Sequence, residues 1–383
     1  MQLKDIKAYL VPISLAILVM LYPLKGGDTL GFGYLPSFAA LSLMMLGFVI
    51  RPRGHFVFVA SDVAVYIYLL FLLFSVLMSG ISEMSLLYLI QIVTLSIIPF
   101  AVIRVAGFTH EDSIRFIKVF PYVAIFSAAS MVIIVGSERL FSYSGYRLGS
   151  EEFNPVGIGY AFGISAFVSF AAIKLRLCGM VVGGLSATVS VAVLILTGSR
   201  GPMLALVAIL FVFMLASREL NWRTLFILCV TGLTAYFVFN SLDLIMVTDR
   251  FTNSIESDSV QARFMSWVQA LTMFKEQPLL GHGLGSFEVK HGEYVHNVVL
   301  EHMANGGLLL TIPFLFLFLS QLQRVFKGIR GQSNEIVMIF ALLGLYAFAV
   351  RMFSLSMSNT KEIFLFLAMA LACGQSLMRT RKN

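Results

Sequence analysis

Charged residues are scarce in this sequence, at 12% of 383 residues, whereas hydrophobic residues make up 58%. Soluble domains carry about a quarter charged residues, so this composition excludes an ordinary soluble protein. The net charge of +7 comes without a basic patch interleaved with aromatic residues, so nucleic-acid binding is not expected. Cysteine is rarer still. The only three lie in or beside apolar segments, which is typical of small core residues and unlike a disulfide framework: Cys178, Cys229 and Cys373.

Long apolar runs recur along the chain, each close to the roughly 20 residues that a transmembrane helix needs. Continuous runs also exclude a transmembrane β-barrel, whose strands alternate between apolar and polar residues. We therefore predict one all-α domain over residues 1–383, a polytopic membrane helical bundle of about 12 transmembrane helices. The runs place these helices at 7–24, 30–50, 56–79, 84–105, 116–136, 155–174, 178–197, 201–217, 223–241, 305–322, 335–353 and 361–378.

The distribution of lysine and arginine orients this bundle. With the N-terminus in the cytoplasm, the inner loops carry 17 of the 27 basic residues, and the outer short loops carry only six. Cytoplasmic loops of membrane proteins have such an excess. We therefore predict cytoplasmic termini and a long loop, 242–304, on the opposite side of the membrane.

The loop 242–304 concentrates the polar chemistry of the chain, including four of the six histidines. It also contains five apolar residues spaced 4, 3, 4, 3, which predict one face of an amphipathic helix on the membrane surface or the bundle: Val260, Phe264, Trp267, Leu271 and Phe274. Pro278 ends that helix. A second helix is predicted to start near Glu293, which would make Glu293 and His296 neighbours one turn apart.

Several arginines are predicted to lie on the outer side of the membrane. Guanidinium groups bind phosphate bidentately and keep their charge, so a group of them predicts a diphosphate clamp. Each also has a simpler interpretation. Arg200 can reach the interface as a snorkelling residue, Arg147 and Arg263 fit solvated surface positions, and Arg351 fits an interface anchor near Lys361.

His296 is the histidine with the most suggestive neighbours, since Glu293 precedes it and Asn297 follows it. A carboxylate there would orient the ring, and histidine titrates near neutrality. No HExxH or HxxEH spacing occurs, so no metal site is predicted. The turn Gly281–Gly285 resembles a phosphate loop only weakly, because it lacks a preceding strand.

Four stretches in order resemble the bacterial O-antigen ligase and O-antigen polymerase superfamily: LTGSRGPMLAL, QARFMSW, PLLGHGLGSF and HNVVLEHMANGGLLL. YRLGSEEFNPVGIGY is similar to that family's segment before a middle helix, so the resemblance covers about 140–322. It implies a glycosyltransferase of the bacterial inner membrane that takes a glycan from undecaprenyl diphosphate at the periplasmic side, without a nucleotide sugar, metal or other cofactor. It implies that Arg200, Arg263 and His296 are the catalytic positions. We add four candidate substrate-binding residues: Arg147, Glu293, Asn297 and Arg351.

Two acceptors fit this chemistry. A polymerase joins the glycan to another lipid-linked repeat unit, with a chain-length regulator as a candidate partner, and a ligase joins it to lipid A-core. Some ligases carry a second histidine where this chain has Tyr294, and the loop is short, so we favour a polymerase. A flippase or exporter of lipid-linked glycan would scatter ionisable residues through the membrane, and Asp62 is the clearest such residue here. A non-catalytic scaffold would leave the arginines without a role.

Overall fold

The computed structural model describes residues 3–20, 35–49, 56–105, 107–135, 154–217 and 258–380. All regular elements in these segments are helical, and six of their helices are long and apolar enough to cross a membrane. Helices occur at eleven of the twelve predicted positions, and the twelfth, 223–241, lies outside the described residues. The all-α class is therefore confirmed, whereas twelve spans and an outer loop stay predictions.

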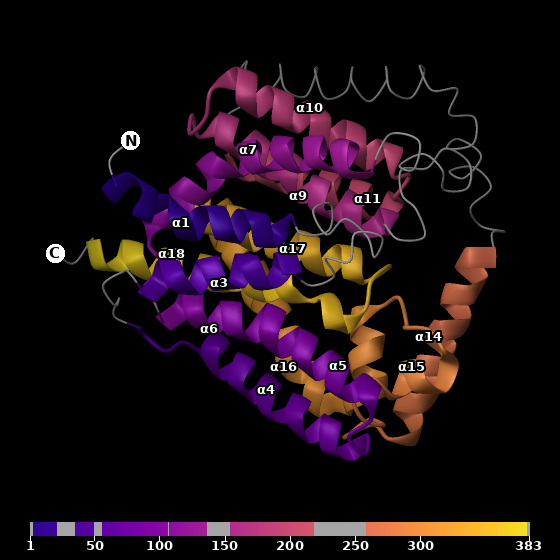
Figure 1. Cartoon of the computed structure of the whole chain (residues 1–383). Helices are drawn as coiled ribbons and strands as arrows, with labels where there is room; N and C mark the ends of the chain where they lie inside the picture. The colour runs from indigo at the N-terminus through magenta and orange to yellow at the C-terminus, as the bar shows by residue number, and fades with distance from the viewer. Residues whose placement is uncertain are drawn as a thin grey trace. The chain divides into compact units, whose positions relative to one another are not determined.

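The chain divides into two compact units, coloured by residue number in Figure 1. The first comprises residues 1–54, 106–249 and 372–383, and the second comprises residues 55–105 and 250–371. The helices of the first unit are α1 (Leu3–Val19), α3 (Leu35–Val49), α7 (His110–Val135), α9 (Pro155–Lys174), α10 (Met180–Leu196) and α11 (Arg200–Ser217).

Helix α9 is the centre of the first unit and packs against α7, α10 and α11. Asn154 caps its start by accepting a hydrogen bond from the Val156 amide at 2.9 Å. All residues from 157 to 173 are buried. Two hydroxyl pairs join α9 to α10, Ser165–Ser190 at 2.7 Å and Ser169–Ser186 at 2.8 Å. Small residues and hydroxyl pairs of this kind are typical of helix packing within membranes.

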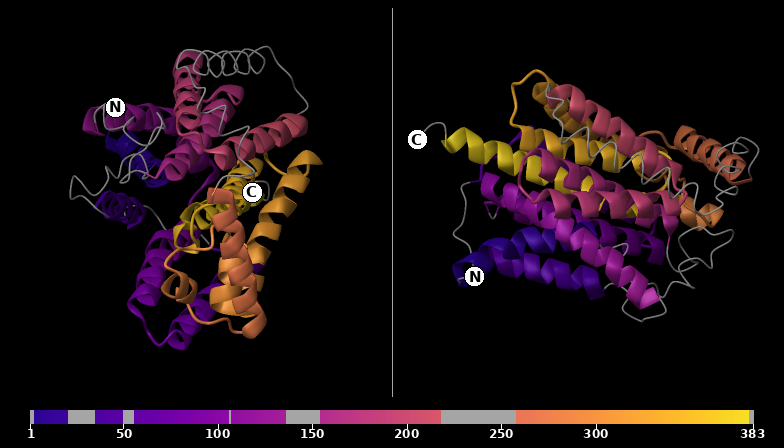
Figure 2. Two further views of the ribbon diagram at one scale, coloured as in Figure 1. Left: turned by 90° about the vertical axis from the view of Figure 1, so that its right-hand side faces the viewer. Right: turned by 90° about the horizontal axis from the view of Figure 1, so that it is seen from above.

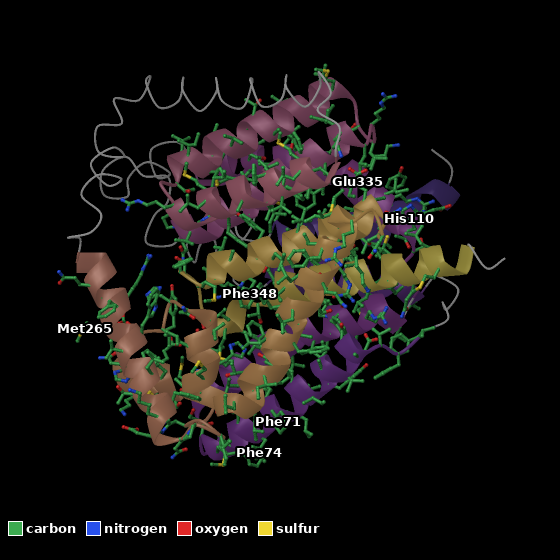
Figure 3. The ribbon with its side chains drawn as sticks, turned by 180° about the vertical axis from the view of Figure 1, so that it is seen from behind. Phe71, Phe74, His110, Met265, Glu335 and Phe348 are labelled. Carbon is green, nitrogen blue, oxygen red and sulfur yellow. The ribbon has the colours of Figure 1, made fainter. Side chains whose placement is uncertain are left out.

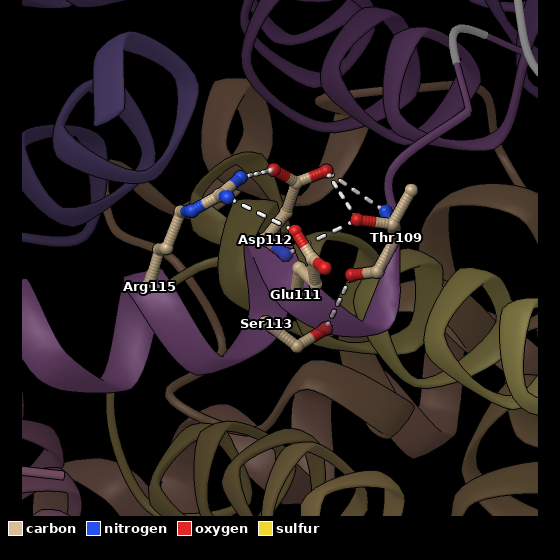
Figure 4. Close-up of polar contacts among 5 residues, drawn as sticks. All are labelled: Thr109, Glu111, Asp112, Ser113 and Arg115. Atoms are coloured by element: carbon tan, nitrogen blue, oxygen red, sulfur yellow. Dashed lines mark hydrogen bonds and ion pairs between the residues drawn. The ribbon is translucent and has the colours of Figure 1, made fainter. Parts of the chain in front are cut away.

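Helix α7 begins six residues earlier than predicted because its start is capped (Figure 4). Asp112 Oδ2 accepts hydrogen bonds from the amide and the hydroxyl of Thr109, both at 2.9 Å. Thr109 Oγ1 in turn accepts from the Asp112 amide at 3.2 Å. Arg115 pairs with exposed Glu111 at 2.9 Å, one turn away. This reciprocal cap satisfies amides that a helix terminus otherwise leaves unpaired.

The second unit is built around the long helix α16 (Val298–Ile329), which packs against α4, α14 and α17 (Figures 1 and 2). Its helices are α4 (Ala60–Met78), α5 (Glu83–Ile92), the π-helix η2 (Val93–Ile97), α6 (Ile98–Val105), α14 (Asp258–Glu276), α15 (Ser286–His291), α16, α17 (Glu335–Arg351), the 3₁₀-helix η3 (Met357–Asn359) and α18 (Lys361–Thr380), which continues beyond the boundary at residue 371.

One of the loop histidines belongs to this core. His302 is fully buried and stacks on Phe314, with ring centroids 4.1 Å apart. Its Nδ1 donates to the Val298 carbonyl at 2.6 Å, so the neutral ring accepts at Nε2 from the Tyr68 hydroxyl at 3.0 Å. His302 therefore has both ring nitrogens satisfied by α4 and α16, as a core histidine should.

A buried ion pair closes one end of the second unit. Arg104, at the end of α6, donates to both carboxylate oxygens of Asp62 at 2.7 Å, and both side chains are 1% exposed. Asp62 also accepts from the Val59 amide at 2.9 Å, in the first turn of α4. The sequence pattern suggested that Asp62 is an ionisable residue within the membrane. In the structure, Asp62 lies at a helix start and its charge is paired, which is typical of a structural clamp.

Candidate functional site

The candidate site lies at the end of the second unit opposite the Asp62–Arg104 pair, where α14 meets the segment that leads into α16. The buried face of α14 packs on that segment through Ala270 and Met273, together with the partly buried Trp267. Ser266 is also buried, and its hydroxyl donates to Glu293 Oε1 at 2.7 Å. Glu293 is thereby tied to α14, which positions the loop between α15 and α16.

The inward face of α14 differs from the predicted apolar face. Trp267 and Phe274 are partly buried, but Phe264 is 62% exposed and Leu271 is 38% exposed. Met265 lies on the same outward side, as Figure 3 shows. The small residues Ser266 and Ala270 face inward instead, because they let α14 approach α16 closely. Spacing alone misjudged the face, since α14 has apolar residues on both sides.

Arg263 lies one turn before Ser266 and Trp267, and so at the edge of the inward face of α14. It is half-buried, and its guanidinium makes no ion pair with any side chain that the structure describes. Its charge acts on two residues of the facing segment: it lowers the pKa of His296 and opposes the rise in the pKa of Tyr294 that burial causes. Among the described residues, Arg263 is therefore a cation without a carboxylate partner, and its charge acts on His296.

His296 is held in an unusual conformation. Its φ of +59° lies in the left-handed region, which costs a non-glycine residue about 1–2 kcal/mol. Its ring lies against that of Tyr294, with centroids 4.2 Å apart. Burial, and then the Arg263 charge, lower the pKa of His296, while Glu293 opposes this shift. The imidazole is therefore neutral at pH 7 and able to accept a proton. Strain of this kind concentrates at functional sites.

The prediction that Glu293 and His296 share a helix is wrong. α16 begins at Val298, because the side chain of Asn297 caps it by accepting from the amides of Val299 and Leu300, both at 3.1 Å. Residues 292–297 form an irregular segment between α15 and α16. Asn297 thus has a clear role in the fold, and substrate contacts by Glu293 and Asn297 stay predictions.

The glycine-rich turn Gly281–Gly285 is hydrogen-bonded to the backbone of α16 at a break in that helix. Gly307 has φ +58° and ψ −157°, which interrupts the helix. The carbonyls freed before the break accept from the turn, from His282 N to Ala304 O at 3.0 Å and from Gly283 N to Asn305 O at 2.8 Å. After the break, the Leu308 amide donates to Pro278 O at 2.9 Å. The turn therefore satisfies backbone groups that the kink would leave unpaired.

Replacing Gly281 with alanine is expected to destabilise this contact strongly. Gly281 has φ +66°, and a Cβ there would lie 2.5 Å from the amide nitrogens of Gly306 and Gly307. The matched control is Gly292→Ala, where φ is +77° but no atom lies within 4 Å. We expect about 1 kcal/mol from the conformational cost at Gly292 and about 2–4 kcal/mol at Gly281, where crowding adds to it. Thermal unfolding in detergent measures both. Equal effects of the two variants would contradict the packing role.

Sequence patterns missed a buried carboxylate cluster beneath the site. Glu301, in the first turn of α16, is 1% exposed. Its Oε1 accepts from the Ser356 hydroxyl at 2.7 Å and its Oε2 from the Met357 amide at 2.9 Å. The Tyr88 hydroxyl lies 3.2 Å from Glu301 and also donates to Glu288. The signal was present, since a glutamate in an apolar helix requires partners, but those partners are more than 50 residues distant in sequence.

Arg351 is fully buried and held by protein groups. Its guanidinium donates to the Asn359 carbonyl and to Glu362 Oε2, each at 2.6 Å, and to the Ala347 carbonyl at 3.0 Å. These bonds tie the end of α17 to the start of α18. A substrate contact by Arg351 would have to replace such partners, so its structural role is the better supported one, and its role in binding stays a prediction.

Arg200 lies in the first unit, at the start of α11. The turn before it uses Gly198 at φ +59°, and the Ser199 hydroxyl donates to the Pro155 carbonyl at 3.2 Å. Gly159 permits this approach, because a Cβ there would lie 2.7 Å from Thr197 Oγ1. The turn thus holds Arg200 at the end of the unit where α9 begins. Its predicted partnership with Arg263 stays a prediction, and Arg147 lies outside the described residues.

No group of three or more His, Cys, Asp or Glu side chains suited to a metal ion occurs in the described segments. No curated protein matches the chain closely enough to be a relative. A family model described as O-antigen ligase matches residues 185–315. That stretch contains Arg200, Arg263 and His296 but excludes Arg147 and Arg351. The match supports the predicted resemblance: residues 185–315 are similar to a family described as O-antigen ligase.

Proposed function

We propose that this protein is a polysaccharide polymerase. It transfers a glycan from undecaprenyl diphosphate to the non-reducing end of a second lipid-linked repeat unit. The observation that supports the proposal is that the charge of Arg263 acts on the strained imidazole of His296, inside the stretch that matches the O-antigen ligase model. A fixed cation beside a base suits a reaction that expels a diphosphate and deprotonates a hydroxyl.

The chemistry follows from these two groups. The acceptor hydroxyl attacks the anomeric carbon, the bond from that carbon to the diphosphate oxygen breaks, and the electron pair leaves with the diphosphate. His296 takes the hydroxyl proton, and Arg263 stabilises the charge on the departing oxygens; the resemblance implies a catalytic role for Arg200 as well. Attack from the face opposite the leaving group inverts the anomeric centre. Preorganised donors of this kind contribute about 3–4 kcal/mol each in other enzymes. In the alternative role, His296 holds a phosphate oxygen.

The protein acts in the bacterial inner membrane under this proposal. Both termini lie in the cytoplasm and the site faces the periplasm. This orientation is based on the excess of basic residues in the inner loops. A topology reporter at residue 290 should then show periplasmic exposure, and one after Asn383 should show cytoplasmic location. A chain-length regulator is the proposed protein partner.

A ligase is the second candidate, because the matching family model is described as O-antigen ligase. The discriminating experiment uses purified protein, lipid-linked repeat units and a chelator, without nucleotide. Polymer formation supports the polymerase, and transfer that occurs only with added lipid A-core supports the ligase. Absence of both products while the donor is bound contradicts a glycosyltransferase. A flippase differs again, since its loss strands lipid-linked repeats on the cytoplasmic face.

A further inference from the structure

An exposed aromatic residue stands out in the loop that joins α17 to η3. Phe353 is 55% exposed, whereas its neighbours Ser354 and Leu355 are 7% and 3% exposed. Its ring lies 6.4 Å from that of Trp267 on α14, at an interplanar angle of 47°. The indole N–H of Trp267 is buried and has no acceptor among the residues described. The pair therefore offers an apolar, π-rich surface next to polar groups of the site.

The loop that presents Phe353 is held firmly from below. Leu355 has φ +68°, a conformation that persists in a non-glycine residue only where the surroundings impose it. Glu301 imposes it here by accepting from the Ser356 hydroxyl and the Met357 amide. The same Ser356 hydroxyl lies 2.9 Å from that of Tyr88. The buried carboxylate thus anchors the loop, and Phe353 is displayed on a preorganised support.

The Phe353–Trp267 pair lies next to the proposed phosphate site. Trp267 follows Arg263 by four residues on α14, so their side chains are neighbours on one helix face. A diphosphate held by Arg263 would have its first sugar within reach of the rings. Sugar rings have apolar C–H faces that pack on aromatic rings, and ligand sites combine such surfaces with a few polar groups.

We propose that Trp267 and Phe353 form a subsite for a sugar ring of the lipid-linked glycan, with Glu301 as the positioning residue of the loop. The inference rests on the proposed function, whose donor supplies the sugar. The competing explanation is that Phe353 anchors the protein in the membrane interface, where aromatic residues gather. The two differ in what they recognise: the subsite recognises the glycan, and the anchor recognises neither glycan nor diphosphate.

The test measures binding of two probes to the full-length protein in detergent. The probes are undecaprenyl diphosphate without sugar and lipid-linked repeat units extracted from the source cells. Phe353→Leu keeps an apolar side chain but removes the ring, and Phe353→Tyr keeps the ring. Phe74→Leu is the matched control, because Phe74 is 41% exposed on α4, as labelled in Figure 3.

We expect Phe353→Leu to weaken binding of the glycosylated lipid about 3–10-fold, the range of one aromatic contact, and to leave undecaprenyl diphosphate binding unchanged. In turnover, KM should rise while kcat stays near the parent value. Phe353→Tyr and Phe74→Leu should behave like the parent. Equal binding by Phe353→Leu and the parent, or equal loss for both probes, overturns the subsite. If the parent binds neither probe, the proposed function fails instead.

Discussion

Replacing His296 with alanine should lower the rate of polymer formation by at least about 100-fold, because general-base catalysis contributes about 10²–10⁴ in rate. The amount of protein in the membrane should stay unchanged, since the His296 side chain packs on the ring of Tyr294 but has no side-chain hydrogen bond to a described residue. Rates are measured with purified protein and lipid-linked repeat units.

The matched control is His291→Ala. His291 lies on α15 only five residues away, and its ring packs on Phe287 at 4.6 Å. Its pKa is lowered by burial and by Lys290, and Arg263 does not contribute to that shift. We expect this variant to retain activity within about threefold of the parent, well short of a lost general base. Full activity of His296→Ala, or equal losses in both variants, would remove His296 from the catalytic machinery.

The same residue predicts a pH dependence. The base form of His296 is needed, and its pKa is lowered by burial and by Arg263. Activity should therefore persist below pH 6.5, the usual value for histidine, and fall only as the pH drops through the lowered pKa. Arg263→Gln removes one cause of the shift, so the pKa rises and the acidic limb of the residual activity moves to higher pH. If the acidic limb of the pH–activity profile does not move in Arg263→Gln, the group that titrates is not His296.

The second large effect is on stability. Asp62→Ala leaves the Arg104 guanidinium buried without its carboxylate, and breaking a buried pair costs about 3–5 kcal/mol. The variant should unfold at a markedly lower temperature in detergent. Replacing both partners by apolar residues, Asp62→Leu with Arg104→Met, should recover most of this loss, because the unpaired charge is then absent.

Glu111→Ala is the control for that experiment. Glu111 pairs with Arg115 across one turn of α7, but its side chain is 73% exposed. Exposed pairs of this spacing contribute about 0.3–0.5 kcal/mol. A change of similar size in Asp62→Ala would show that the buried pair is not the clamp we infer.

Much of the fold followed from the sequence because apolar length is a strong signal. Eleven predicted helices correspond to described ones, and α14 (Asp258–Glu276) contains all five apolar residues whose spacing predicted a helix there. The ends were less accurate, since they depend on single side chains. Asn297 sets the start of α16 at Val298 instead of near Glu293, and the Thr109–Asp112 cap extends α7 to His110.

The candidate site was predictable only in part. Arg263 and His296 were identified from their resemblance to family positions, and in the folded chain the charge of Arg263 acts on His296. The cluster of Glu301, Tyr88 and Ser356 was not identified, because its members come from two helices and a loop that only the folded chain brings together. The spacing of residues within one segment gives no information on contacts between segments that are distant in the sequence.

The burial of α9 on all sides has a consequence for the order in which the helices are inserted and packed. This helix leaves the ribosome before α10 and α11 exist, so it enters the bilayer with lipid on the faces they later cover. A largely apolar surface suits that interval, and Ser165 and Ser169 are among its few polar residues. Their partners, Ser190 and Ser186, arrive with α10. Insertion of α10 is therefore the step that gives these hydroxyls of α9 their hydrogen-bond partners. It also brings the first unit to its final packing.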